Sequence, residues 1–184
     1  PIPQTPTPIP LKIKNLFLDA VSSVASDISQ YVVHPEKDLS RSKKLPSDKL
    51  ISFMVYCGSS STKIELLDFF GLGTDAPSAS AFSQQRAKLK PEALEAVFKH
   101  FNTSLQSEEK FSEYRFFAAD GSSFTFFSKP HFAPEEYHVC EGHSAKGYYS
   151  MHLNAFYDLQ KHTYSDALIQ PVHQKDEFSA FCSM

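Results

Sequence analysis

The spacing of apolar residues changes near the middle of the chain, and this change limits the folds available to it. Up to about residue 105 the apolar residues recur every three or four positions, as in amphipathic helices. After residue 113 they alternate or form short runs, as in strands. A polar stretch at 103–113 separates the two patterns. We therefore expect an α+β or α/β fold, in which an all-helical N-terminal region precedes a β-rich region.

This change of pattern predicts three parts. Residues 1–10 are rich in proline and should form an extended tail, 11–105 should form a helical region, and 114–184 should form a sheet domain. Helices are predicted at 11–33, 47–58, 63–70, 78–89 and 91–101. Strands are predicted at 114–119, 123–127, 148–158 and 163–170, followed by the start of a helix at 176–181. Because the chain ends just inside that helix, we expect a truncated domain.

Within the third predicted strand, apolar and polar residues alternate. Residues 149, 151, 153, 155 and 157 are apolar, while Ser150, His152 and Asn154 lie between them. One face of this strand should therefore be wetter than the other. Further upstream, Thr62 and Glu65 have the spacing of a capping box at a helix start.

Composition narrows the possible partners and the location. The net charge of −3 indicates no general affinity for nucleic acid, so DNA binding would need a local basic patch. The three cysteines, Cys57, Cys140 and Cys182, are widely spaced and are expected to be free thiols in a reducing cytosol. No apolar run is long enough to predict a membrane span.

Asp120 is the leading candidate for acid–base or metal chemistry. It follows the apolar run that ends at Ala119 and precedes Gly121, so we expect it at the end of a buried strand and facing a cleft. A carboxylate there needs a cation, a proton or hydrogen-bond donors to offset its desolvation. The alternative is an Asp-Gly turn without any chemical role.

Basic and amide side chains gather at two places in the predicted helical region. Gln and Arg can contact base edges and Lys can neutralise phosphates, although solvated surfaces also carry such residues. The candidate DNA-binding residues are Arg41, Lys43, Lys44, Gln84, Gln85, Arg86, Lys88 and Lys90.

A third candidate site is a group of histidines with one cysteine. Nitrogen and sulfur ligands from these side chains could bind Zn²⁺, but their spacing is not that of standard zinc motifs. A His-rich loop is the alternative. The residues are His131, His138, Cys140 and His143.

Several stretches, taken in order, resemble the insertion-sequence-4 family of DDE transposases. The segments at 44–54, 65–70 and 77–89 resemble the N-terminal region of that family. Residues 118–122 resemble its first catalytic-acid strand, 147–159 its next strand, and 164–180 its third strand and first helix. The resemblance runs from about residue 40 to the end of the chain and implies an incomplete ribonuclease-H-like mixed sheet.

The resemblance also implies an activity, DNA strand cleavage and transfer with two Mg²⁺ or Mn²⁺ ions. Asp120 matches the first of the family's three catalytic acids, while Asp166 and Glu177 do not match the other two. The chain should therefore be inactive alone, bind transposon ends, self-associate and reside on DNA in the bacterial cytosol. The alternatives are a non-catalytic DNA-binding or regulatory protein and a His/Cys metal-binding module.

Overall fold

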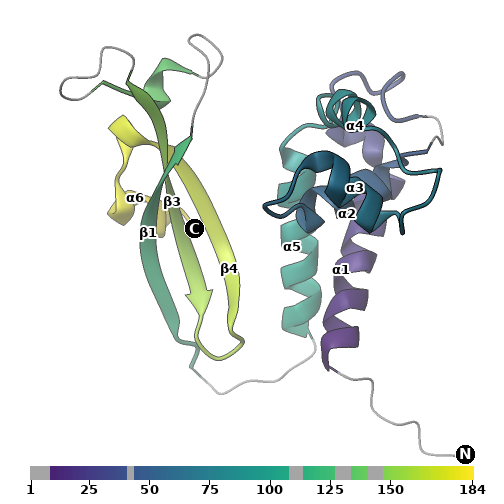
Figure 1. The fold of residues 1–184 in the computed structure, drawn as a ribbon. Coiled ribbons are helices and arrows are strands. Elements are labelled where there is room, and N and C mark those ends of the chain that lie inside the picture. The colour runs from purple at the N-terminus through teal and green to yellow at the C-terminus, as the bar shows by residue number, and fades with distance from the viewer. Residues whose placement is uncertain (1–8, 41–43, 108–113, 127–133, 141–146) are drawn as a thin grey trace, which may run out of the picture. The chain divides into compact units, whose positions relative to one another are not determined.

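Two compact units make up the structure. The computed structural model describes residues 9–40, 44–107, 114–126, 134–140 and 147–184. Contacts between residues divide the chain into Pro1–Glu109 and Lys110–Met184. The first unit is helical and the second is built on a sheet, so the fold is mixed α and β (Figure 1). The dividing point lies in the polar stretch 103–113.

The helical unit contains five α-helices among its described residues. They are α1 (Ile9–Ser26), α2 (Ser47–Tyr56), α3 (Thr62–Phe69), α4 (Ala79–Arg86) and α5 (Glu92–Ser107), with a 3₁₀ turn η1 at Ile28–Tyr31. Helix α2 joins two apolar cores. Its Ile51 packs with α1 and α5 around Val21 and Val97. Its Phe53 packs with α3 and α4 around Leu66 and Phe82.

The helix ends differ from prediction at several places. The first helix was expected to reach Val33 but ends at Ser26, because Val32 instead forms an isolated antiparallel bridge with Leu89. Helix α5 extends well beyond the expected end at 101. The capping box at Thr62 is also wrong, because Glu65 accepts hydrogen bonds from the N–H groups of Gly58 and Ser60 at 3.0 and 2.8 Å. This buried carboxylate ties the α2–α3 connection to α3.

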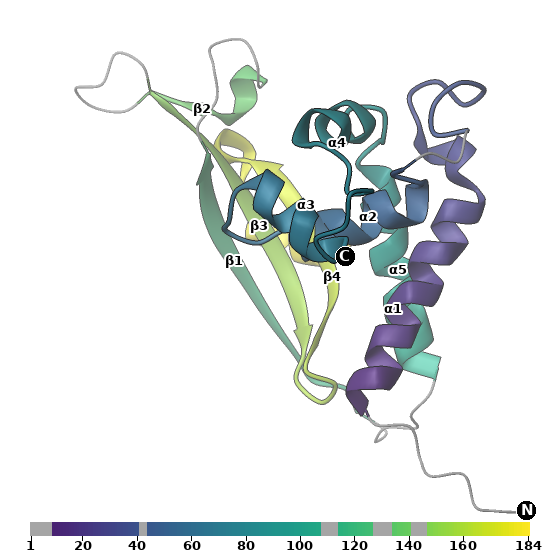
Figure 2. The same ribbon diagram turned by 45° about the vertical axis from the view of Figure 1, so that its right-hand side comes forward.

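The second unit is an open, antiparallel sheet with one short helix packed against it (Figures 1 and 2). Its strands are β1 (Phe117–Phe126), β2 (His138–Val139), β3 (Tyr148–Asp158) and β4 (Thr163–Pro171), followed by helix α6 (Glu177–Ser183). Two 3₁₀ turns, η2 (Glu135–Tyr137) and η3 (Val172–Gln174), precede β2 and α6. Strand β3 is central and pairs with the other three strands. Every described pairing is antiparallel, so the expected mixed sheet is not present in these residues.

Strand β1 runs through the position where a turn was predicted. The two short strands expected at 114–119 and 123–127 are one strand, in which Asp120 pairs with Ala155 and Gly121 pairs with Asn154. The alternative interpretation, an Asp-Gly turn, is therefore wrong. Instead, a glycine at position 121 leaves room for two side chains, because a Cβ there would lie 2.4 Å from His152 Nε2 and 2.8 Å from Glu177 Oε1.

The polar face of β3 is the buried one. Ser150, His152, Asn154 and Asp158 are each at most 5% exposed. Helix α6 packs on this face through the stacked rings of Phe156 and Phe181, 5.5 Å apart. The opposite face carries partly exposed apolar side chains, which we call the open face: Phe124, Met151, Leu153, Tyr157 and Ile169. Hydropathy alone would suggest the reverse. The polar side chains can be buried because each has a hydrogen-bond partner on a neighbouring segment: the Phe124 carbonyl for Ser150, Ser123 and Glu177 for His152, Gln170 for Asn154 and Arg115 for Asp158.

Candidate functional site

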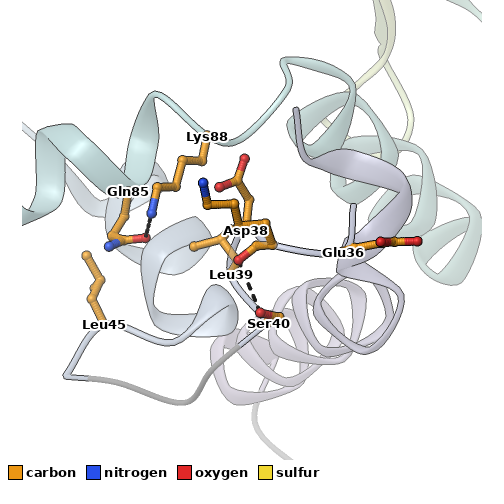
Figure 3. Close-up of a pocket in the computed structure, with 8 residues that line it drawn as sticks. Glu36, Asp38, Leu39, Ser40, Leu45, Gln85 and Lys88 are labelled. Atoms are coloured by element: carbon orange, nitrogen blue, oxygen red, sulfur yellow. Dashed lines mark hydrogen bonds between the residues drawn. The ribbon is translucent and has the colours of Figure 1, made fainter. Parts of the chain in front are cut away.

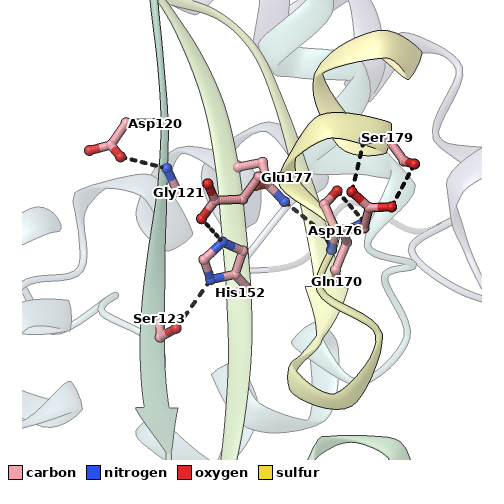
Figure 4. A network of polar contacts seen from close by, with 9 residues as sticks. Asp120, Gly121, Ser123, His152, Gln170, Asp176, Glu177 and Ser179 are labelled. Carbon is pink, nitrogen blue, oxygen red and sulfur yellow. Dashed lines mark hydrogen bonds and ion pairs between the residues drawn. The ribbon is translucent and has the colours of Figure 1, made fainter.

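Asp120 lies in the middle of β1 and its side chain is exposed. Its Oδ1 atom accepts a hydrogen bond from the adjacent Gly121 N–H at 2.8 Å. Because successive side chains of a strand point to opposite faces, Asp120 lies on the side of β1 away from His152 and Glu177 (Figure 4). Asp120 lies on a paired strand, although not at its end as expected. The expected burial and cleft are wrong, because helix α6 covers the other face of the sheet.

No other acid joins Asp120 in a metal site within the described chain. Among the described residues, no group of three or more His, Cys, Asp or Glu side chains is placed to hold a metal ion. Asp166 lies on β4 opposite Phe156, and Glu177 is the first residue of α6. A two-ion site needs several carboxylates that converge on both cations. The described residues do not fit such a site.

The outward surface of α4 combines amide, hydroxyl and guanidinium groups. Ser78 caps the helix by accepting the Ala81 N–H at 3.1 Å, and the buried Phe82 ring fixes its inner face against Phe53. Gln84 and Arg86 remain exposed. No Asp or Glu occurs between residues 76 and 91, although this stretch contains one Arg and two Lys. This stretch therefore has a net positive charge in a protein that is negative overall.

Two of the predicted DNA-binding residues lie partly withdrawn from this surface. Gln85 and Lys88 line a polar pocket with Glu36 and the buried Asp38 (Figure 3). The Lys88 ammonium donates to Gln85 Oε1 at 3.3 Å. The two acids reduce the positive potential at this pocket, so Gln84, Arg86 and Lys90 are better placed to contact an extended polyanion.

The other predicted basic cluster is described only at one residue. Lys44 is exposed and lies 3.9 Å from Asp75 Oδ1, in an ion pair that solvent screens. Arg41 and Lys43 lie outside the described residues.

The proposed His/Cys site is described only in part. His131 and His143 lie outside the described residues. The His138 carbonyl accepts from His173 Nε2 at 2.6 Å, and the His138 ring lies 3.7 Å from the Glu135 carboxylate. Cys140 is exposed, and like Cys57 and Cys182 it forms no disulfide. Within the described part of the chain, His138 and Cys140 belong to no group of three or more metal-ligating side chains.

The covered face of the sheet holds a polar network that the sequence analysis missed. His152 lies between Ser123 and Glu177: Ser123 Oγ is 3.1 Å from its Nδ1, and Glu177 Oε1 is 3.1 Å from its Nε2 (Figure 4). Asn154 donates to Gln170 Oε1 at 2.9 Å, and Gln170 in turn binds the backbone of Asp176 at the start of α6. The alternating polar residues of β3 were the available signal, because three of them share one face.

Asp158 forms a second buried polar centre at the end of β3. Burial works to raise its carboxyl pKa, but the Arg115 guanidinium and the N–H groups of Lys161 and Gln160 outweigh burial and lower that pKa. Arg115 donates to Asp158 Oδ2 at 2.7 Å, and the two N–H groups donate to Oδ1 at 3.0 and 2.9 Å. This arrangement closes the β3–β4 turn, where His162 has a positive φ of 56°.

No family model, curated protein or solved structure matches the chain. Among the described helices, none is both long and apolar enough to cross a membrane. A functional assignment therefore depends on the geometry of the two units.

Proposed function

We propose that the chain is a DNA-binding portion of an insertion-sequence-4 type transposase. In this proposal the helical unit binds transposon ends on DNA in the bacterial cytosol. The second unit is the first half of a ribonuclease-H-like catalytic domain. Apart from the two-residue β2, the strands and helix follow one another as β1, β3, β4 and α6. This order supports the second part, because the resemblance implies three strands followed by a helix.

The observation that carries the DNA-binding proposal is the outward surface of α4. Helices α2, α3 and α4 contact one another around a single apolar core, and α4 is the last of the three. In helix-turn-helix proteins, the last helix of such a group enters the major groove. Gln84 and Arg86 would contact base edges or phosphates there, and Lys90 would contact the flanking backbone.

The catalytic part of the proposal depends on further acidic residues that the described part of the chain does not place beside Asp120. Asp120 would supply one carboxylate ligand to Mg²⁺ or Mn²⁺, a role for which oxygen ligands are suited. Since one acid does not hold two ions, the chain alone should not cleave DNA. Strand cleavage and transfer belong to an assembly in which further acids are supplied.

The exposure of Asp120 favours a second candidate, a non-catalytic regulatory protein that binds DNA through the same helices. The two candidates differ in one assay. Mg²⁺-dependent nicking of terminal-repeat DNA by the chain, extended with a segment that supplies further acids and with loss on Asp120→Ala, supports the transposase. DNA binding with no nicking in that extended protein supports the regulator.

Binding itself is tested by fluorescence anisotropy of the full chain with a 20-base-pair duplex at several salt concentrations. Each phosphate contact that is lost should reduce the slope of log K against log salt by about 1. Arg86→Ala should weaken binding and lower this slope. Lys14→Ala, which removes the same charge from an exposed position of α1, should leave both the affinity and the slope unchanged. Equal effects of the two variants, or no binding at low salt, would reject the proposed surface.

A further inference from the structure

Three side chains on the covered face of the sheet form a linear chain of hydrogen bonds. Ser123 Oγ lies 3.1 Å from His152 Nδ1, and His152 Nε2 lies 3.1 Å from Glu177 Oε1 (Figure 4). A hydroxyl, an imidazole and a carboxylate in this order are the components of an activated nucleophile. This arrangement is independent of the DNA-binding surface on α4.

The fold brings these residues together from three elements. Ser123 of β1 pairs directly with His152 of β3, so both side chains point to the same face. Glu177 follows Asp176, whose carboxylate accepts from Ser179 N–H and Ser179 Oγ and so caps α6. The absence of a side chain at position 121 leaves the space that the imidazole and Glu177 carboxylate occupy.

The hydrogen bonds also select the imidazole tautomer. An ionised carboxylate can only accept, so His152 Nε2 carries the proton and donates it to Glu177. The lone pair of Nδ1 then faces the Ser123 hydroxyl, which donates to it. His152 is 4% exposed and held at both nitrogens, whereas Ser123 is exposed to an incoming reagent. The base is thus fixed and the hydroxyl is accessible.

We propose that Ser123 is a nucleophile for acyl transfer from small activated esters. His152 acts as its base, and Glu177 is a positioning residue. Ser123 Oγ attacks the ester carbonyl carbon while its proton moves to His152 Nδ1, and the resulting imidazolium returns this proton to the departing alkoxide as the ester C–O bond breaks. Water then attacks the acyl-serine and transfers a proton through His152 to Ser123 Oγ, which releases the carboxylic acid.

A fluorophosphonate probe tests the nucleophile directly, because Ser123 Oγ would displace fluoride and form a stable adduct. Mass spectrometry of the labelled full chain should locate the adduct on Ser123, and Ser123→Ala should abolish it. Ser122→Ala is the matched control and should label normally, since Ser122 is exposed on the same strand but pairs with Leu153 on the other face.

The roles of His152 and Glu177 are tested by the rate of labelling and by p-nitrophenyl acetate hydrolysis. His152→Gln should slow both by about 100-fold or more, the usual contribution of a positioned base. Glu177→Gln, which preserves size but removes charge, should give an intermediate rate at an unchanged melting temperature, and Glu177→Asp should recover part of the loss. Gly121→Ala should slow labelling by displacing the imidazole, which gives a second test if His152→Gln does not fold.

Two results would overturn the proposal whatever the variants do. The first is a wild-type chain that labels no faster than free serine. The second is an adduct on Ser123 whose rate is the same in His152→Gln or Gly121→Ala as in the wild type.

Discussion

Removing the Arg115 side chain should weaken the sheet unit by an amount that follows from its contacts. Arg115 donates to a carboxylate oxygen of Asp158, which is 1% exposed, and its guanidinium lies 4.7 Å from the Phe117 ring centroid. A hydrogen bond to a charged group contributes about 1.5–3 kcal/mol, and an exposed cation–π contact about 0.5–1 kcal/mol. Solvent reaches part of Arg115, so we expect Arg115→Ala to cost about 2–3 kcal/mol, towards the lower end of this sum.

The pH dependence of this loss has a defined sign. The folded state lowers the pKa of Asp158, so its contribution is present above the unfolded pKa and is lost as the pH falls through the folded value. The wild type and Arg115→Ala should therefore differ fully at pH 7. The difference should shrink below about pH 4, near the ordinary pKa of aspartate.

Amide hydrogen exchange measured by mass spectrometry is the appropriate assay, because it reports the stability of β3 and β4 separately from the helices. Arg115→Lys, which keeps the charge but loses the planar fork, should give an intermediate loss. Arg86→Ala makes the same substitution in the helical unit and should leave β3 exchange unchanged. Unaltered β3 exchange in Arg115→Ala at pH 7, or a difference that grows as the pH is lowered, would refute the reasoning.

Three further predictions concern the core, a loop and the open face. Phe53→Ala should destabilise the helical unit by about 3–5 kcal/mol in denaturant melts, because Phe53 is fully buried, whereas Val55→Ala at an exposed site should cost little. Glu65→Ala should cost about 1–3 kcal/mol through two unsatisfied loop N–H groups. The same variant should speed alkylation of Cys57, because burial and then the Glu65 carboxylate raise the pKa of this thiol. If the expected self-association occurs through the open face, Ile169→Lys should reduce it in light scattering. Ile64→Lys, at a similarly exposed position on α3, should not. Equal effects of the two variants would exclude the open face.

The periodicity of the sequence predicted those elements whose pattern of buried and exposed residues is set within the element itself. The start of α2 at Ser47 and the bounds of β3 at 148–158 agree with prediction, because Phe53 and the alternating residues of β3 follow the period of their own element. The end of α1 could not be predicted in this way, because Val32 forms a β-bridge with Leu89, which is distant in the sequence.

The candidate site was harder to predict because its geometry depends on strand register. Asp-Gly normally indicates a turn, and only pairing with Ala155 and Asn154 keeps Asp120 and Gly121 within a strand. The contacts of His152 with Ser123 and Glu177 join residues 29 and 25 positions apart. No local pattern specifies such contacts, although the polar alternation along β3 marked the face on which they lie.

The most direct test of the DNA-binding proposal is to locate bound DNA on the protein. A titration of the ¹⁵N-labelled full chain with a short duplex, followed by amide chemical shifts, distinguishes the surfaces. We predict that the largest shifts occur at Gln84, Arg86 and Lys90 and diminish as salt is raised. Shifts confined to the sheet unit, or none at low salt, would contradict the proposal.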